Sequence, residues 1–194
     1  MRLLALAGLL ALAAPANAQL IPSIDLGVAG GLNFASLGDA GQFDLDSSTG
    51  YHIGLYADVG VLFFSARTGV YYVKAGDIRD VRRPNADDLE DSAAYVAVPV
   101  DFQLKTPTPV LQAYVLAGPE FRFPVSGLET FEQENMTVAG NVGLGIRGGV
   151  PLIGPSGYVE LRYGLDLTGL NSESTTADDE VKLNVVFLRV GLGI

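Results

Sequence analysis

The chain contains no cysteine, no tryptophan and only one histidine, His52. The lack of cysteine excludes disulfides, thiolate metal sites and the lipid-anchored N-terminus of a lipoprotein. Beyond residue 18 the sequence also lacks any run of 18 apolar residues, which excludes an ordinary transmembrane helix there. The chain is nevertheless 48% hydrophobic with 24 glycines, so its apolar residues must be arranged in another way.

The N-terminus shows the three regions of a secretory signal peptide in their usual order. Arg2 supplies the positive start, residues 3–14 are apolar, and Ala16-Asn17-Ala18 forms an A-x-A cleavage site before Gln19. The apolar region is too short to span a bilayer, and the alternative of a buried helix leaves the order of the regions unexplained. We therefore expect residues 1–18 to be a cleaved signal peptide and residues 19–194 to form one exported domain.

The net charge of −10 is concentrated in four segments, each of which carries −3 or −4: 35–50, 76–93, 124–135 and 169–180. The rest of the chain is slightly positive. This distribution is typical of acidic, solvated loops between nearly neutral strands. It also argues against nucleic-acid binding, because a polyanion would be repelled.

Apolar residues alternate with small or polar ones through eight segments of about ten residues, the length that a tilted membrane strand needs. In the first segment Ile24 and Leu26 lie on one face, while Asp25 and Gly27 lie on the other. The alternation is clear in 24–34, 136–147, 157–168 and 186–194, and weaker in 51–60, 65–75, 94–104 and 111–123.

The connections between these segments alternate in length. Short ones are expected near 61–64, 105–109 and 150–156, and the long ones are the four acidic segments. Short periplasmic turns and long outer loops are the convention of outer-membrane barrels. The sequence therefore predicts an all-β, eight-stranded antiparallel up-and-down transmembrane β-barrel in the outer membrane, with both termini in the periplasm.

The less apolar face of the segments combines glycine and alanine with charges of both signs. In a water-soluble β-sandwich, which is the alternative fold, such residues would face solvent and would not need so many glycines. Inside a barrel of eight strands, side chains just fill the interior. We therefore expect a structural network of paired charges that plugs the barrel, made of Asp25, Asp58, Arg67, Asp101, Glu120, Arg122, Arg147, Glu160, Arg162, Asp166 and Arg189.

Two further features bear on the barrel. Pro99, Pro119 and Pro124 lie in or beside predicted strands, and each is expected to need a bulge or a strand end. Because tryptophan is absent, any aromatic girdle has to be built from tyrosine and phenylalanine. The candidates are Phe34, Tyr51, Phe63, Phe64, Tyr72, Tyr95, Phe121, Phe123 and Tyr163.

Four short stretches of the predicted strands carry a family resemblance: RTGVYY (67–72), YVAVPV (95–100), YVLAGP (114–119) and VELRY (159–163). They resemble the PorT-like outer-membrane β-barrel domain of Bacteroidota and their relatives, over essentially the whole mature chain. The resemblance implies a small barrel with a link to envelope biogenesis or protein export, and it accounts for Pro99 and Pro119. One departure is the last residue, Ile194, where such barrels commonly end in an aromatic residue that the insertion machinery reads.

Three motifs have chemical interpretations that we consider weaker than structural ones. Gly143-Leu-Gly145-Ile-Arg-Gly148 matches a dinucleotide fingerprint, but it lies inside a strand and no helix follows it. His52 is expected to be structural or at the rim, since a strand separates it from Asp58 by ~20 Å. The acidic runs at 44–50, 87–88 and 178–180 offer oxygen ligands without the spacing of an EF-hand, so solvated loops are favoured over cation sites.

Three function classes remain open at this point. The first is a non-enzymatic barrel that acts structurally or through its four acidic extracellular loops. The second is a small-solute or ligand-holding barrel, and the third is a membrane hydrolase or acyltransferase, for which one histidine is poor support. We favour the first, with no catalytic, cofactor or metal residues. The expected partners are outer-membrane lipid and lipopolysaccharide, the barrel-insertion machinery, and envelope or export proteins.

Overall fold

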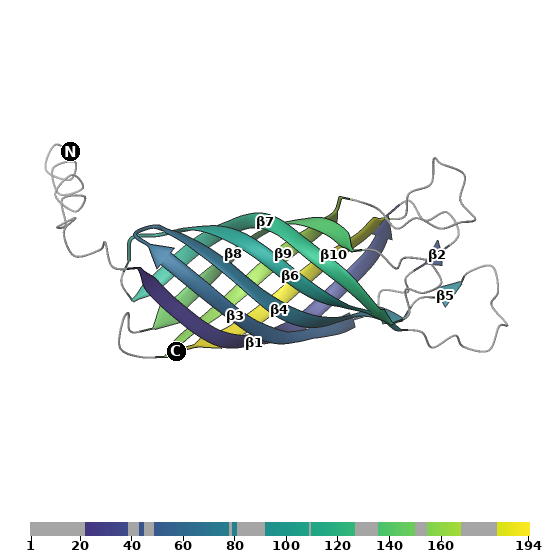
Figure 1. Cartoon of the computed structure of the whole chain (residues 1–194), viewed down its shortest axis with the longest axis horizontal. Coiled ribbons are helices and arrows are strands. Elements are labelled where there is room, and N and C mark those ends of the chain that lie inside the picture. The colour runs from purple at the N-terminus through teal and green to yellow at the C-terminus, as the bar shows by residue number, and fades with distance from the viewer. Residues whose placement is uncertain are drawn as a thin grey trace, which may run out of the picture.

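The eight long strands close into one antiparallel barrel, as the sequence predicts (Figure 1). The structure is a computed structural model, and it describes residues 22–38, 43–44, 49–77, 79–80, 92–108, 110–126, 136–149, 155–167 and 182–194. Around the barrel the strands follow the order β1-β10-β9-β8-β7-β6-β4-β3. Their bounds are β1 (Ser23–Gly38), β3 (Thr49–Val61), β4 (Phe64–Asp77), β6 (Ser92–Lys105), β7 (Leu111–Ser126), β8 (Thr137–Gly149), β9 (Ser156–Asp166) and β10 (Lys182–Gly193).

Seven of these strands are longer than predicted, and β9, with 11 residues, is one residue shorter than the predicted segment 157–168; the strands have 11 to 16 residues each. The additional residues lie mostly at the ends next to the long connections, so that β1, β4 and β7 continue into the acidic segments. A further pair of two-residue strands, β2 (Phe43–Asp44) and β5 (Arg79–Asp80), lies beyond that end of the barrel (Figure 1). The sequence did not predict this pair.

The connection between β3 and β4 is a two-residue hairpin turn at Leu62 and Phe63, where the sequence predicts a short turn. Leu62 has a φ of 57°, in the left-handed region that a leucine rarely adopts. The C-terminus lies at this same end of the barrel (Figure 1). There Ile194 exchanges two backbone hydrogen bonds with Leu26, so the last residue takes part in closing the barrel.

The strand register defines how far the strands tilt. A path across paired residues once around the barrel returns to β1 ten residues further on, at Phe34 instead of Ile24. With a rise of ~3.3 Å per residue and a strand spacing of ~4.8 Å, ten residues over eight strands correspond to a tilt of about 40°. The path runs through Ile24, Val59, Ala66, Phe102, Ala117, Val142, Tyr163, Val186 and Phe34.

The outer face of the barrel is apolar along its whole length. Ile53, Leu55 and Leu144 are more than half exposed there, a position that water would penalise and lipid would favour. Of the expected girdle residues, Tyr95 is wrongly assigned, because it is buried inside the barrel with 1% of its surface exposed. The outer face does expose the aromatic side chains of Phe34, Tyr51, Phe63, Phe64, Tyr72, Phe123 and Tyr163.

The three prolines are accommodated in two ways. Pro124 lies beside a bulge, because the β6–β7 register shifts between Ala94 and Tyr95. Pro99 and Pro119 do not fit the prediction of a bulge or a strand end. Each lies within a strand, and the pairing with the neighbouring strands keeps the same register before and after the proline. The proline ring removes the backbone N–H that residue 99 would otherwise donate. At this position the hydroxyl of Thr68 on β4 donates to the carbonyl of Pro99 on β6 at 2.9 Å and adds a hydrogen bond between the two strands.

Several sequence-based expectations lie outside the described residues. These are the signal peptide with its cleavage site, the turn at 150–154, and most of the four acidic segments, including 87–88 and 178–180. In the part of the chain that is described, no helix is long and apolar enough to cross a membrane.

Candidate functional site

The candidate site is the charged interior of the barrel. The structure places all eleven predicted side chains on the inner face of the strands. Ten of them are buried, and Arg147 keeps 16% of its side chain exposed. Lys105 is a further interior charge, at a position that the sequence pattern assigns to the turn at 105–109. With it, six cations face six carboxylates among the described residues of the interior.

Lys105 could have been found from the sequence by extending the alternation of Asp101 and Gln103 by one more step. It is the last residue of β6, directly before the Thr106-Pro107 turn, and the turn signal masked its strand position. Its ammonium group lies 3.2 Å from a carboxylate oxygen of Asp58. The twelve described interior charges therefore balance only when this lysine is included.

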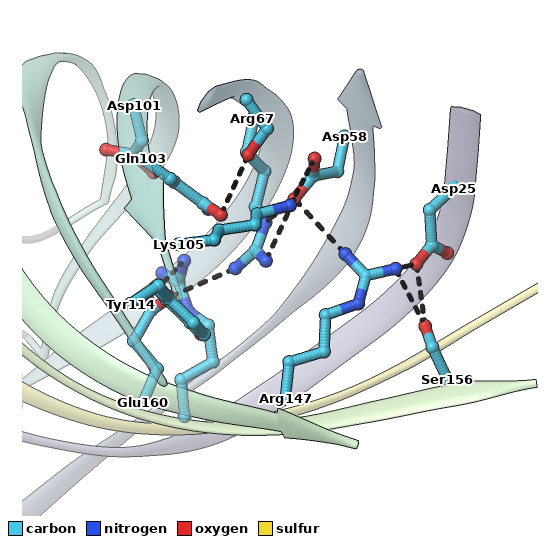
Figure 2. A network of polar contacts seen from close by, with 12 residues as sticks. Asp25, Asp58, Arg67, Asp101, Gln103, Lys105, Tyr114, Arg147, Ser156 and Glu160 are labelled. Atoms are coloured by element: carbon cyan, nitrogen blue, oxygen red, sulfur yellow. Dashed lines mark hydrogen bonds and ion pairs between the residues drawn. The ribbon is translucent and has the colours of Figure 1, made fainter. Parts of the chain in front are cut away.

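Two carboxylates lie side by side at the short-turn end of the barrel. Asp25 and Asp58 are direct cross-strand partners on β1 and β3, an arrangement that would be repulsive without cations. Arg147 of β8 bridges them from across the lumen, with one guanidinium nitrogen on Asp25 and the other 3.4 Å from Asp58 (Figure 2). Ser156 also donates to Asp25 at 2.6 Å. One arginine thus pairs with carboxylates on two neighbouring strands.

Asp58 is shared by three cations. Besides Arg147 and Lys105, it pairs with Arg67, whose Nη2 lies 3.1 Å from Oδ2 of Asp58. Arg67 also reaches the other wall of the barrel, where it donates to Glu160 of β9 at 3.0 Å (Figure 2). Arg67 therefore connects the cluster at the short-turn end with the middle of the lumen.

Glu160 is the centre of the network and is fully buried. Three arginines surround its carboxylate: Arg67 at 3.0 Å, Arg162 at 3.0 Å and Arg189 at 3.7 Å. The hydroxyl of Tyr114 donates to it as well, at 2.9 Å. A carboxylate buried this deeply is tolerable only with several such partners.

Tyrosine rings cover the arginines of this network. The guanidinium carbon of Arg67 lies 4.2 Å from the ring centroid of Tyr158 and within 5.5 Å of those of Tyr56 and Tyr114. Arg189 lies 4.1 Å from the ring centroid of Tyr71. Such contacts stabilise a desolvated guanidinium through the quadrupole of the ring.

Glycines on the inner face make room for these rings. A Cβ at Gly191 would collide with the ring of Tyr158, and one at Gly145 would collide with the end of Tyr114. Gly145 belongs to the dinucleotide-like motif, and the whole motif lies in β8. Its spacing thus fits small residues in a crowded interior, and the strand offers no helix N-terminus for a pyrophosphate.

A second cluster lies nearer the long-loop end. Glu120 accepts from Arg122 at 2.8 Å and from the amide of Asn141 at 3.0 Å. Arg122 crosses to β10 and donates to the backbone carbonyl of Leu183 at 3.1 Å. Asp166 accepts from the backbone N–H of Leu183 at 3.4 Å.

His52 lies inside the barrel rather than at its rim, with 2% of its surface exposed. Its Nε2 accepts from Nε of Arg189 at 3.3 Å, and its ring packs edge-on against Phe187 at 5.3 Å between centroids. A ring nitrogen occupied by a guanidinium is not available as a general base. No cluster of three or more metal-binding side chains occurs among the described residues.

Comparisons with known proteins bear on the fold. No protein-family model matches the chain, and no curated protein matches it either. Among solved structures the chain is similar to Neisserial surface protein A (NspA), with 10% identity, a TM-score of 0.55, and coverage of 89% of this chain and 98% of that one.

Two further structures are matched with lower TM-scores. The N-terminal barrel domain of Pseudomonas aeruginosa OprF has 10% identity, a TM-score of 0.44, and coverage of 88% and 97%. Ail, the attachment invasion locus protein of Yersinia pestis, has 13% identity, a TM-score of 0.46, and coverage of 88% and 98%. Of these three only NspA has a TM-score above 0.5, and at 10% identity this likeness concerns the fold alone: the chain has the fold of a small eight-stranded outer-membrane β-barrel.

Proposed function

We propose that the protein is a non-enzymatic outer-membrane barrel whose lumen is closed by its own charges, and that it acts through its surface and loops. The observation that carries this proposal is the set of ion pairs that join opposite walls of the barrel. Arg67 connects β4 to β9, Arg147 connects β8 to β1 and β3, and Arg162 connects β9 to Asp101 of β6. A lumen crossed in this way has little space for solute.

Electrostatics makes this closure stable. Removing one partner of a buried ion pair leaves an uncompensated charge and costs about 3–5 kcal/mol, so an ion passing through would have to break pairs that are expensive to break. Because the described interior has equal numbers of cations and carboxylates, it also offers no net charge that would select a passing ion.

The outer face supports the membrane location. Exposed aliphatic side chains cover all eight long strands, and the aromatic residues that remain exposed include Tyr51 and Tyr72, whose rings lie 6.4 Å apart. An apolar band with aromatic residues at its borders is typical of barrels in lipid. In this proposal the short turns are periplasmic and the acidic segments are extracellular.

The proposal extends to partners. Acidic loops outside the membrane would meet lipopolysaccharide and envelope or export proteins, and the insertion machinery would handle the barrel during assembly. Membership of the PorT-like family is part of the same proposal; it is supported by the four short stretches, which lie on β4, β6, β7 and β9.

Fractionation and gel mobility test the proposal. The protein should be recovered in the outer-membrane fraction, and it should migrate faster in a detergent gel when it is not heated, as folded barrels do. Purified protein in liposomes should leave them impermeable to small sugars. Recovery in the soluble periplasm without a heat-dependent shift would refute the membrane barrel, and sugar-permeable liposomes would refute the closed lumen.

A further inference from the structure

The turn between β3 and β4 is apolar throughout, although short turns at this end of a barrel usually meet water. It runs through Val61, Leu62, Phe63 and Phe64, and all four side chains are exposed, from 39% at Val61 to 65% at Phe64. Hairpin turns in water are usually built from glycine, asparagine or aspartate, which tolerate a positive φ. Here Leu62 adopts the φ of 57° instead. The composition of this turn therefore fits apolar surroundings.

The backbone of the turn also suits lipid, where an unpaired polar group is costly. Val61 and Phe64 are direct cross-strand partners, so only two residues connect the strands. The carbonyl of Phe63 accepts from the backbone N–H of Lys105 at 2.7 Å, which binds the turn to the end of β6. Phe63 is thus held beside the neighbouring strand.

Lys74 indicates where the turn lies relative to the membrane. It is the direct partner of Tyr51 across β3 and β4. Because the exposed side chain of Tyr51 lies on the outer face, Lys74 lies on that face too. A lysine on the lipid-facing surface is costly at the midplane of the bilayer and tolerated at its border. Lys74 therefore marks the border on the long-loop side.

The distance from this border to the turn matches the height of the apolar band of a membrane barrel. Phe64 and Lys74 lie ten residues apart on β4. With a rise of ~3.3 Å per residue and a tilt of about 40°, ten residues advance by ~25 Å along the barrel axis. The apolar band of a barrel is about 25 Å tall. The opposite border thus falls at Phe64, with Phe63 next to it.

We propose that the β3–β4 turn is embedded in the inner leaflet of the outer membrane, with the ring of Phe63 where phospholipid chains meet their headgroups. Lipid is the occupant of this surface because the turn continues the exposed apolar side chains of Val61 and Phe64 without interruption. This inference rests on the proposed membrane location.

The neighbouring turn, between β6 and β7, has the opposite character. Thr106, Pro107 and Thr108 are exposed there. The hydroxyl of Thr106 accepts from the backbone N–H of Ala113 at 3.0 Å and lies 3.0 Å from the hydroxyl of Thr108. Such polar side chains are typical of a turn in water. The inference thus assigns one short turn to lipid and its neighbour to water.

The absence of tryptophan from the chain allows a direct test by fluorescence. Three variants each carry a single tryptophan: Phe63→Trp in the apolar turn, Pro107→Trp in the polar turn, and Leu55→Trp on the outer face in the middle of β3. Each is refolded into phosphatidylcholine vesicles. The fluorescence is quenched either by lipids brominated at defined chain positions or by iodide on both sides of the membrane.

We expect bromine near the headgroup end of the chains to quench Phe63→Trp most, and bromine deeper in the chains to quench Leu55→Trp most. Iodide should quench Phe63→Trp about threefold less than Pro107→Trp, because an aromatic ring at the membrane border is shielded from water. Gel mobility without heating confirms that each variant is folded. If Phe63→Trp fails to fold, Phe63→Cys labelled with bimane gives the same two readouts.

Two outcomes would overturn the inference. One is iodide quenching of Phe63→Trp equal to that of Pro107→Trp. The other is a Phe63→Cys thiol that reacts with a water-soluble maleimide in vesicles but not in native outer membranes, since a protein partner would then cover the turn. Leu55→Trp without quenching by brominated lipid would instead contradict the membrane barrel itself, so the two failures can be told apart.

Discussion

Replacing Glu160 by glutamine removes the central negative charge of the interior. In Glu160→Gln the three arginines around the carboxylate lose a partner at 3.0 to 3.7 Å, while the size of the side chain is kept. Asp58 still compensates Arg67 and Asp101 still compensates Arg162, so the loss is concentrated on Arg189. Breaking a buried pair costs about 3–5 kcal/mol, and we expect the free energy of unfolding to fall by that amount.

The assay is equilibrium unfolding in urea after refolding into lipid vesicles, with the fraction folded read from unheated gels. Asp25→Asn is the matched control: it also neutralises one interior carboxylate, but its partner Arg147 keeps 16% of its side chain exposed and still has Asp58 at 3.4 Å. We expect it to cost about 1 kcal/mol, because water and Asp58 replace part of the lost interaction. Equal losses for the two variants, or a loss below about 1 kcal/mol for Glu160→Gln, would refute the central role of Glu160.

Further variants test the ring packing, the turn and the lipid-facing surface. Gly191→Ala should displace the ring of Tyr158 and destabilise the barrel by about 1–3 kcal/mol in the same urea assay; an unchanged midpoint would contradict the close approach seen there. Leu62→Gly should stabilise it by about 1 kcal/mol, because glycine adopts a φ of 57° without strain; a lower midpoint would show that the leucine side chain matters more. Leu55→Arg, at a side chain with 65% of its surface exposed on the outer face, should cost about 2–4 kcal/mol in vesicles, and a loss near zero would argue that this face is not in lipid.

The fold could be predicted from the sequence because a barrel in lipid imposes one pattern on every strand. Each residue faces either lipid or a crowded interior, so alternation identifies both the strand and its inner face. This worked best where the inner face carries charge, as in β9, where Glu160 and Arg162 alternate with Leu161 and Tyr163. The alternation of short and long connections then predicted which strand ends meet at the short-turn end of the barrel and which meet at the long-loop end.

Prediction was poorer where both faces are similar in character. In the segment around Tyr95 the residues on both sides are alanine and valine, so hydropathy alone does not show which way the aromatic ring points. Lys105 was missed because turn residues follow it directly. The partners of each charge could not be predicted at all, since they depend on the register of all eight strands: Arg67 and Glu160 are 93 residues apart in the chain.

The most direct test of the closed, charge-filled interior is a single-channel recording of the purified, refolded protein in a planar lipid bilayer. The account predicts insertion without stable conductance steps, because the ion pairs that join opposite walls of the barrel close the lumen. Stable, reproducible steps from the unaltered protein would contradict it.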